Sequence, residues 1–144
     1  MTMDLRQITP DFAVAPQITP EEVAAIAALG YRTLINNRPD DEIEDALDSD
    51  AMAVAAAEAG LAYHHLPYFP GQMTPDLVAA FEAVMATVEG PVLAYCRSGT
   101  RSSHLWAMEQ AGKRPVTQIL SAAAEAGYDH SGLVPLLEEH AARR

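Results

Sequence analysis

The stretch PVLAYCRSGTRS, residues 91–102, joins an apolar segment to a short loop that holds a cysteine, a glycine and two arginines. Its first five residues form a continuously apolar run, which is typical of a strand buried on both faces of a parallel sheet. The residues from about Thr100 to Ala111 predict a helix directly after the loop. A buried strand, a tight loop and a helix in this order indicate an α/β fold with this segment at its centre.

The same alternation continues on both sides of this segment. Thr19-Pro20-Glu21-Glu22 is typical of a helix start, because a hydroxyl can cap the first N–H groups and proline fits the first helical turn. The predicted strands lie at 12–15, 32–36 and 61–66, and the predicted helices at 20–29, 50–59, 75–89, 117–126 and 133–142. Strands separated by helices imply right-handed βαβ units. The sequence therefore predicts a three-layer αβα fold with a parallel sheet of four to five strands, in one domain over residues 1–144.

The composition excludes several classes of protein. Nine Lys and Arg against 20 Asp and Glu give a net charge of −11, which argues against nucleic acid and anionic membrane as partners. No apolar run approaches the ~20 residues that span a bilayer, and the first ten residues contain no apolar signal core. Cys96 is the only cysteine, which excludes an internal disulfide and fits a reducing compartment. We therefore expect a cytoplasmic protein.

The acidic stretch 39–50 is expected to be a solvated loop or a frayed helix.

The loop after Cys96 has the features of an anion cradle. Its backbone N–H groups can turn inward, with Gly99 permitting the tight path, and the positive end of the following helix points at the same place. Arg97 and Arg101 add two full positive charges. These terms favour the thiolate of Cys96 and would hold an oxyanion beside the sulfur. Cys96 and Arg101 are the predicted catalytic residues. The predicted anion-binding residues are Arg97, Ser98, Gly99, Thr100, Ser102 and Arg38.

Ligands of parallel sheets bind at the carboxyl ends of the strands, where three segments should meet. These are residues 36–38, 67–73 and 96–101. Arg38 is either a second anion contact or part of a salt bridge to Asp40 or Asp41. The segment 68–73 either walls the cradle or packs beneath it, and His104 either shuttles a proton or packs in its helix. A metal or cofactor is not expected, because the chain has no zinc-type cysteine pairs, no His-Glu-x-x-His and no nucleotide-binding glycine motif.

Two families use a cysteine–loop–arginine cradle of this kind. Protein tyrosine and dual-specificity phosphatases carry His-Cys, five residues and Arg, whereas rhodanese-type sulfurtransferases use a shorter loop. Here four residues separate Cys96 from Arg101, so the phosphatase arginine would fall on Ser102, and Tyr95 stands in the place of the histidine. The loop length therefore resembles that of the sulfurtransferases.

A closer resemblance covers most of the chain. Residues 17–21 (QITPE), 30–40 (GYRTLINNRPD) and 95–103 (YCRSGTRSS) resemble the small phosphatase-like domain of beta-lactamase hydrolase-like proteins. That family carries the domain alone or fused to a metallo-beta-lactamase-type persulfide dioxygenase. The resemblance implies a protein-tyrosine-phosphatase-like fold with a rhodanese-like active loop, and a role in bacterial sulfide and persulfide metabolism. Any dioxygenase partner would be a separate protein.

Three functions follow as expectations. The first is sulfur transfer, in which Cys96 takes sulfane sulfur from a small anion or thiol substrate, such as thiosulfate or a low-molecular-weight persulfide, and carries it as a persulfide. The second is phosphatase chemistry, in which Cys96 attacks phosphorus and a carboxylic acid protonates the leaving group. Asp76 is the candidate for that acid, and its alternative role is to stabilise the start of its helix. The third is a non-catalytic sensor of anions or persulfides.

Overall fold

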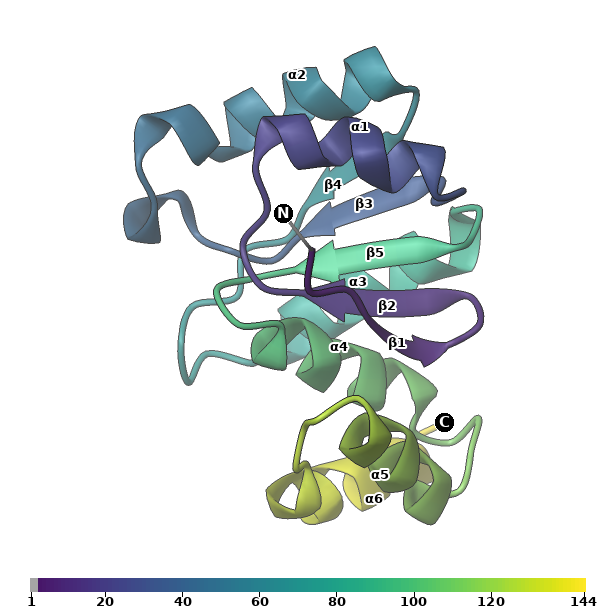
Figure 1. Ribbon diagram of the computed structural model, residues 1–144. Coiled ribbons are helices and arrows are strands. Elements are labelled where there is room, and N and C mark those ends of the chain that lie inside the picture. Colours follow the sequence, from purple (N-terminus) through teal and green to yellow (C-terminus); the bar gives the residue numbers. More distant parts are fainter. Residues whose placement is uncertain (1–2) are drawn as a thin grey trace.

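The computed structural model describes residues 3–144, so the first two residues of the predicted domain lie outside it. Its centre is a five-stranded sheet in the order β1-β2-β5-β3-β4 (Figure 1). The strands are β1 (Arg6–Thr9), β2 (Phe12–Ala15), β3 (Thr33–Asn36), β4 (Ala62–His65) and β5 (Val92–Tyr95). The helices are α1 (Pro20–Ala28), α2 (Ser49–Ala59), α3 (Pro75–Thr87), α4 (Thr100–Gln110), α5 (Val116–Glu125) and α6 (Val134–Ala142).

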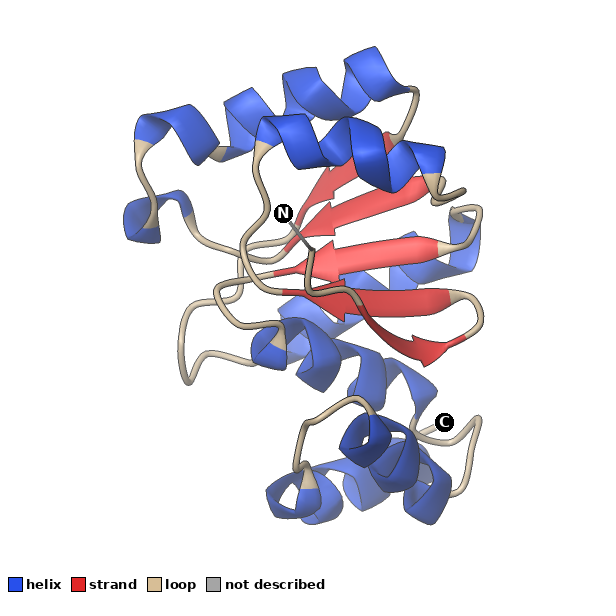
Figure 2. Cartoon of the chain, in the orientation of Figure 1, coloured by secondary structure: helices blue, strands red, loops and turns tan. Residues whose placement is uncertain are grey.

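Helices cover both faces of the sheet, which confirms the predicted three-layer fold. Figure 2 shows α1 and α2 on one face and α3 and α4 on the other, with α5 and α6 packed beyond α4. Strands β2, β5, β3 and β4 are parallel, as expected. Strand β1 is not predicted from the sequence and runs antiparallel to β2. Ile8 is the only buried residue of β1, so the segment shows no apolar pattern.

The central strand β5 divides its side chains between two apolar cores. Val92 and Ala94 face the core formed with α3 to α6, where Trp106 stacks on Phe12 with 6.4 Å between ring centroids. Leu93 and Tyr95 face the core formed with α1 and α2. Both cores bury their members almost completely, as a strand covered on two faces requires. This packing fixes the end of β5, and with it the position of Cys96.

The carboxyl ends of the parallel strands meet at one edge, where the predicted segments come together. Asn36 at the end of β3 is paired with both Tyr95 of β5 and His65 of β4. Beyond the strands, the Asn37 N–H donates to the Tyr95 carbonyl at 2.8 Å, and the Tyr68 N–H donates to the Asn37 carbonyl at 2.9 Å. The three segments are thus joined by backbone hydrogen bonds beside the cysteine loop.

The acidic stretch after β3 is ordered as two short 3₁₀ turns, η1 (Asp40–Glu42) and η2 (Asp45–Leu47). The Asp40 carboxylate accepts a hydrogen bond from the Ser49 N–H at 2.9 Å, which ties η1 to the start of α2. Glu42 at the end of η1 is turned inward and is only partly exposed. Among residues 3–144, no helix combines the length and apolar character needed to cross a membrane.

Candidate active site

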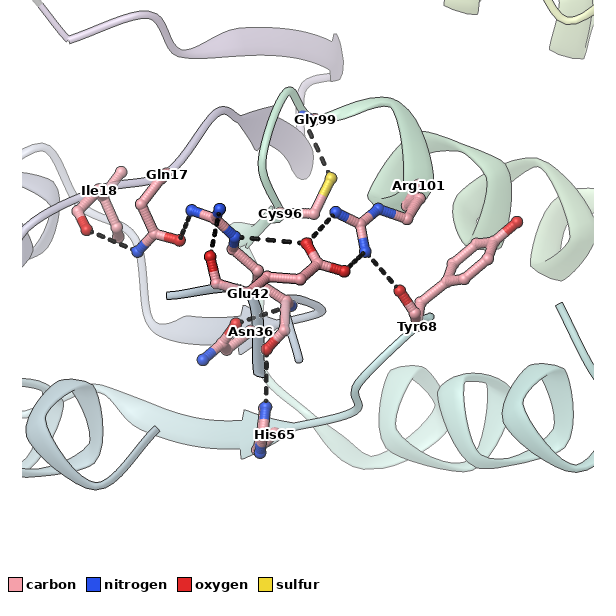
Figure 3. A network of polar contacts seen from close by, with 10 residues as sticks. Gln17, Ile18, Asn36, Glu42, His65, Tyr68, Cys96, Gly99 and Arg101 are labelled. Atoms are coloured by element: carbon pink, nitrogen blue, oxygen red, sulfur yellow. Dashed lines mark hydrogen bonds and ion pairs between the residues drawn. The ribbon is translucent and has the colours of Figure 1, made fainter. Parts of the chain in front are cut away.

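Cys96 lies directly after β5 and has no exposed surface. Its Sγ accepts a hydrogen bond from the Gly99 N–H at 3.2 Å, as Figure 3 shows. Gly99 is also the residue that caps the N-terminus of α4, and among residues 3–144 no side chain caps this helix end. The sulfur therefore accepts from a backbone donor at the positive end of a helix, which is an arrangement that stabilises negative charge.

Gly99 is the point at which the loop turns into α4. Its φ of +88° lies in the left-handed region that favours glycine. Tyr128, between α5 and α6, donates a hydrogen bond from its hydroxyl to the Ser98 carbonyl at 3.1 Å. A Cβ at Gly99 would lie 2.3 Å from this hydroxyl oxygen. The far side of the loop is therefore held by the C-terminal helices and has no space for a side chain.

Gly99→Ala is expected to lower the free energy of unfolding by about 2 kcal/mol or more, since it combines backbone strain with overpacking. Gly71→Ala is the matched control, because Gly71 has a φ of +75° and nothing within 4 Å of its Cβ position. That variant is expected to lose only about 1 kcal/mol. Urea unfolding of both variants measures the difference, and equal losses would show that Tyr128 does not constrain the loop.

Arg101, in the first turn of α4, is held by a carboxylate and a carbonyl. Its Nη1 and Nη2 donate to the two carboxylate oxygens of Glu42 at 2.9 and 2.7 Å, and Nη1 also donates to the Tyr68 carbonyl at 2.6 Å (Figure 3). Within residues 3–144, its Nε–H and second Nη2–H have no acceptor. These two donors form one edge of the planar guanidinium. The fork that binds a carboxylate or phosphate in bidentate fashion is therefore available.

Arg38, after β3, binds the same glutamate from another side. Its Nη2 donates to the Glu42 carbonyl at 2.8 Å, and its Nε lies 3.5 Å from a Glu42 carboxylate oxygen. Asp40 and Asp41, the two carboxylates considered in the sequence, are both exposed. Hydrogen bonds from Arg101, assisted by the charge of Arg38, hold the pKa of Glu42 below its usual range. Glu42 is therefore an ionised bridge between two arginines.

Glu42 is the functional residue that the sequence does not reveal. It is one of seven acidic residues between positions 39 and 50, and nothing in that run distinguishes it from its neighbours. Only the path of η1 brings it to Arg101, which is 59 residues away in the sequence. An acidic residue four positions after Arg38 is a weak signal, because ion pairs at this spacing are common on protein surfaces.

The other predicted residues of the loop and of the first turn of α4 differ in exposure and in hydrogen-bond partners. The side chains of Arg97 and Ser98 are exposed, and the Ser98 hydroxyl donates to that of Thr100 at 3.1 Å. The Ser102 hydroxyl, which the sequence predicts to bind an anion, donates to the Asn37 side-chain oxygen at 2.8 Å. Ser102 therefore joins α4 to the end of β3.

Asp76 is exposed in the first turn of α3, where Thr74 caps the helix by accepting from the Leu77 N–H at 3.1 Å. This location suits a carboxylate that stabilises a helix start.

Among residues 3–144, no group of three or more His, Cys, Asp or Glu side chains is arranged to hold a metal ion.

Two histidines lie behind the loop on the side of α4. His104 Nδ1 lies 3.1 Å from the Tyr68 hydroxyl, and its ring lies 4.8 Å from that of His130. His130 Nε2 lies 2.7 Å from the Ser103 hydroxyl, which also donates to the Thr100 carbonyl. Burial, together with the charge of His130, lowers the pKa of His104 to about 4. His104 is therefore neutral at neutral pH and acts as a packing and hydrogen-bonding group.

The lowered pKa of His104 predicts a pH-dependent stability. The unfolded chain protonates this residue below about pH 6.5, whereas the folded chain protonates it only below about pH 4. The free energy of unfolding should therefore fall as the pH drops from about 6.5 towards about 4. In His104→Gln this fall should be smaller, although His130, whose pKa is also lowered, retains part of it. Urea titrations across this range measure the slope, and an unchanged slope in the variant would contradict the assignment.

Comparisons with known proteins agree on one type of domain. Residues 4–113 match the family described as "Beta-lactamase hydrolase-like protein, phosphatase-like domain". A beta-lactamase hydrolase-like protein of Xylella fastidiosa (strain 9a5c) is 34% identical over 141 residues, which cover 96% of this chain and 33% of the relative. One of Agrobacterium fabrum (strain C58) is 31% identical over 105 residues, covering 73% of this chain and 24% of the relative. The chain thus spans about a third of the length of the first of these relatives.

The similar solved structures carry phosphatase descriptions. A candidate phosphatase from Neisseria meningitidis Z2491 has a TM-score of 0.82 and 33% identity, covering 96% of this chain and 99% of the other. A candidate phosphatase from Shewanella putrefaciens CN-32 has a TM-score of 0.74 and 23% identity, covering 98% of this chain and 90% of the other. The kinase associated phosphatase shares the fold, with a TM-score of 0.72 and 12% identity over 92% of this chain and 86% of the other.

These comparisons contradict the prediction of sulfur transfer. The matched family is phosphatase-like, and the three similar structures are described as phosphatases or candidate phosphatases. The prediction rested on a loop that is one residue shorter than the phosphatase pattern. Loop length is a poor guide here because the long side chain of Arg101 is positioned by Glu42 and Tyr68, on other elements. The persulfide, sulfur-donor and rhodanese-type assignments are wrong with it. The separate dioxygenase partner stays a prediction.

Proposed function

Because this chain belongs to the phosphatase-like domain family of beta-lactamase hydrolase-like proteins, we propose that it is a cysteine-dependent phosphatase. The observation that carries the proposal is the placement of the Cys96 sulfur at the N-terminus of α4, within a hydrogen bond of the Gly99 N–H. Arg101 lies in the first turn of the same helix and keeps one bidentate edge available. The nucleophile and the anion-binding groups thus lie in one short segment, the loop after β5 and the first turn of α4.

The reaction has two steps. The Cys96 thiolate attacks the phosphorus atom, the new S–P bond forms, and the bond from phosphorus to the leaving oxygen breaks. Water then attacks the phosphocysteine, the S–P bond breaks, and inorganic phosphate leaves with the thiolate restored. The available edge of Arg101 and the loop N–H groups bind the phosphoryl oxygens, whose charge they stabilise in the transition state. Glu42 acts as a positioning residue, because it fixes the adjacent Nη1/Nη2 edge of the guanidinium.

This chemistry requires a reduced cysteine, so we propose a cytoplasmic location for the domain. The longer relatives have about two thirds of their length outside the matched region. The proposal therefore concerns the activity of this domain alone.

The test is turnover of p-nitrophenyl phosphate, followed by release of nitrophenolate and of inorganic phosphate. Reactions stopped by acid after a short time should contain protein with one added phosphoryl group, and peptide mapping should place it on Cys96. Vanadate should inhibit in competition with the substrate. Binding of vanadate without any turnover or phosphoprotein would instead identify a non-catalytic anion sensor and refute the proposal.

A further inference from the structure

The groups around the loop decide which leaving groups this site can expel. When a phosphate ester is cleaved, the leaving oxygen takes up the bonding electrons. An alkoxide needs a proton from a general acid at that moment, which contributes about 10²–10⁴-fold to the rate. A leaving group that departs as a stable anion needs no such proton. The leaving groups that the site can expel therefore depend on whether a neighbouring acid carries a proton at neutral pH.

The segment that passes beside Arg101 contains no carboxylic acid. Residues 66–74, LPYFPGQMT, connect β4 to α3 and contact the site through the Tyr68 carbonyl, which accepts from Arg101 at 2.6 Å. The first acid after this segment is Asp76, whose side chain is exposed on the first turn of α3. The segment thus supplies a backbone carbonyl to the site but no proton donor of the carboxylic type.

The carboxylate that the fold does bring to the site is unsuited to donate a proton. Both oxygens of Glu42 accept hydrogen bonds from Arg101, and one also faces Arg38. Two guanidinium groups keep it ionised, and the pKa of Glu42 is lowered as a result. A proton on either oxygen would break one of the two short contacts.

The nearby imidazole is equally unsuited. His104 Nδ1 is engaged by the Tyr68 hydroxyl, and the ring packs edge-on against His130. With its pKa lowered to about 4, His104 is neutral at neutral pH and lacks the acidic second proton of an imidazolium. The hydroxyl of Tyr68 is itself directed at this imidazole.

We propose that this site is selective for phosphoryl groups on leaving groups that depart as stable anions, namely acyl phosphates and phosphoric anhydrides, and discriminates against alkyl phosphate monoesters. The inference rests on the proposed phosphatase function. In the first step the electron pair of the broken P–O bond stays on the leaving oxygen, and no proton is transferred. In the second step water supplies the hydroxyl that phosphorus gains, and its remaining proton is released to solvent or phosphate. A tyrosyl phenol, with a pKa of about 10, is a poor leaving group under these conditions.

The experiment measures kcat/KM for a series of aryl phosphates with progressively less acidic phenols, from p-nitrophenyl to phenyl phosphate. Phosphoserine represents the alkyl esters, and acetyl phosphate represents the acyl phosphates. We expect kcat/KM to fall by at least about 100-fold from p-nitrophenyl to phenyl phosphate, since no general acid compensates for the poorer leaving group. Acetyl phosphate should be hydrolysed and phosphoserine should not.

Asp76→Asn tests the rival acid in the same series. The dependence on the leaving group should be unchanged in this variant, and a selective loss with phenyl phosphate would overturn the inference. Equal kcat/KM values across the wild-type series would also overturn it, while leaving the phosphatase function intact. If p-nitrophenyl phosphate gives neither turnover nor phosphocysteine, the proposed function fails, and the inference fails with it.

Discussion

Cys96→Ser is expected to lower kcat/KM for an aryl phosphate by about 1,000-fold or more, because the variant keeps the anion cradle but loses the nucleophile. A serine hydroxyl is close in size to the thiol and can accept the Gly99 N–H in its place. It remains protonated, however, and within residues 3–144 the hydrogen-bond partner of the Cys96 sulfur is the Gly99 N–H, which cannot act as a base. The buried site should therefore stay folded while chemistry stops.

Two measurements separate the loss of chemistry from loss of structure. Urea unfolding should give a free energy within about 1 kcal/mol of the wild type, since the substitution removes little buried surface. Equilibrium dialysis should show that inorganic phosphate still binds. A variant that retains more than about a tenth of the wild-type kcat/KM would refute the role of Cys96 as nucleophile.

Arg101→Lys is expected to lower kcat/KM by about 10²–10³-fold, the range seen when a transition-state anion loses a fixed donor. An ammonium group keeps the charge, but it cannot hold both Glu42 oxygens and still present a bidentate edge to a phosphoryl group. We expect the loss mainly in kcat, because the fork binds the developing charge more strongly than the ground state.

Arg32→Lys provides the matched control. Arg32 forms an exposed ion pair with Glu89, at the opposite end of the sheet from the cysteine loop. This variant should keep wild-type kinetics and nearly wild-type stability, because exposed ion pairs contribute about 0–1 kcal/mol. If both arginine variants lose activity equally, general destabilisation rather than the lost fork explains the effect.

The fold could be predicted in large part because its signals are local. Helix starts such as Thr19-Pro20, the glycine after α2 and the apolar run of β5 each report on a few adjacent residues. Helix boundaries therefore agree with the structure to within a few residues. Strand β1 was missed because its pairing with β2, rather than its own pattern, makes it a strand.

The site could be predicted only where it is carried by one segment. Cys96, Gly99 and Arg101 lie within six consecutive residues, in the loop after β5 and the first turn of α4, and their spacing predicts the site. The bridge through Glu42 and the bond from Ser102 to Asn37 join residues 59 and 65 positions apart, and no local pattern encodes them. The prediction of sulfur rather than phosphorus chemistry was wrong because it relied on the length of one loop and on what the family resemblance implied, and neither describes the contacts that position Arg101.

The support that Tyr128 and His130 give to the loop has a consequence for where this domain ends. The family match stops at residue 113, before either side chain. Yet the phenol holds the Ser98 carbonyl, and the imidazole lies against the Ser103 hydroxyl on α4. A fragment trimmed to the matched region would keep Cys96 and Arg101 but would lose the hydrogen bonds that Tyr128 and His130 make to the loop and to α4. The region that the family match covers is thus shorter than the smallest unit expected to work.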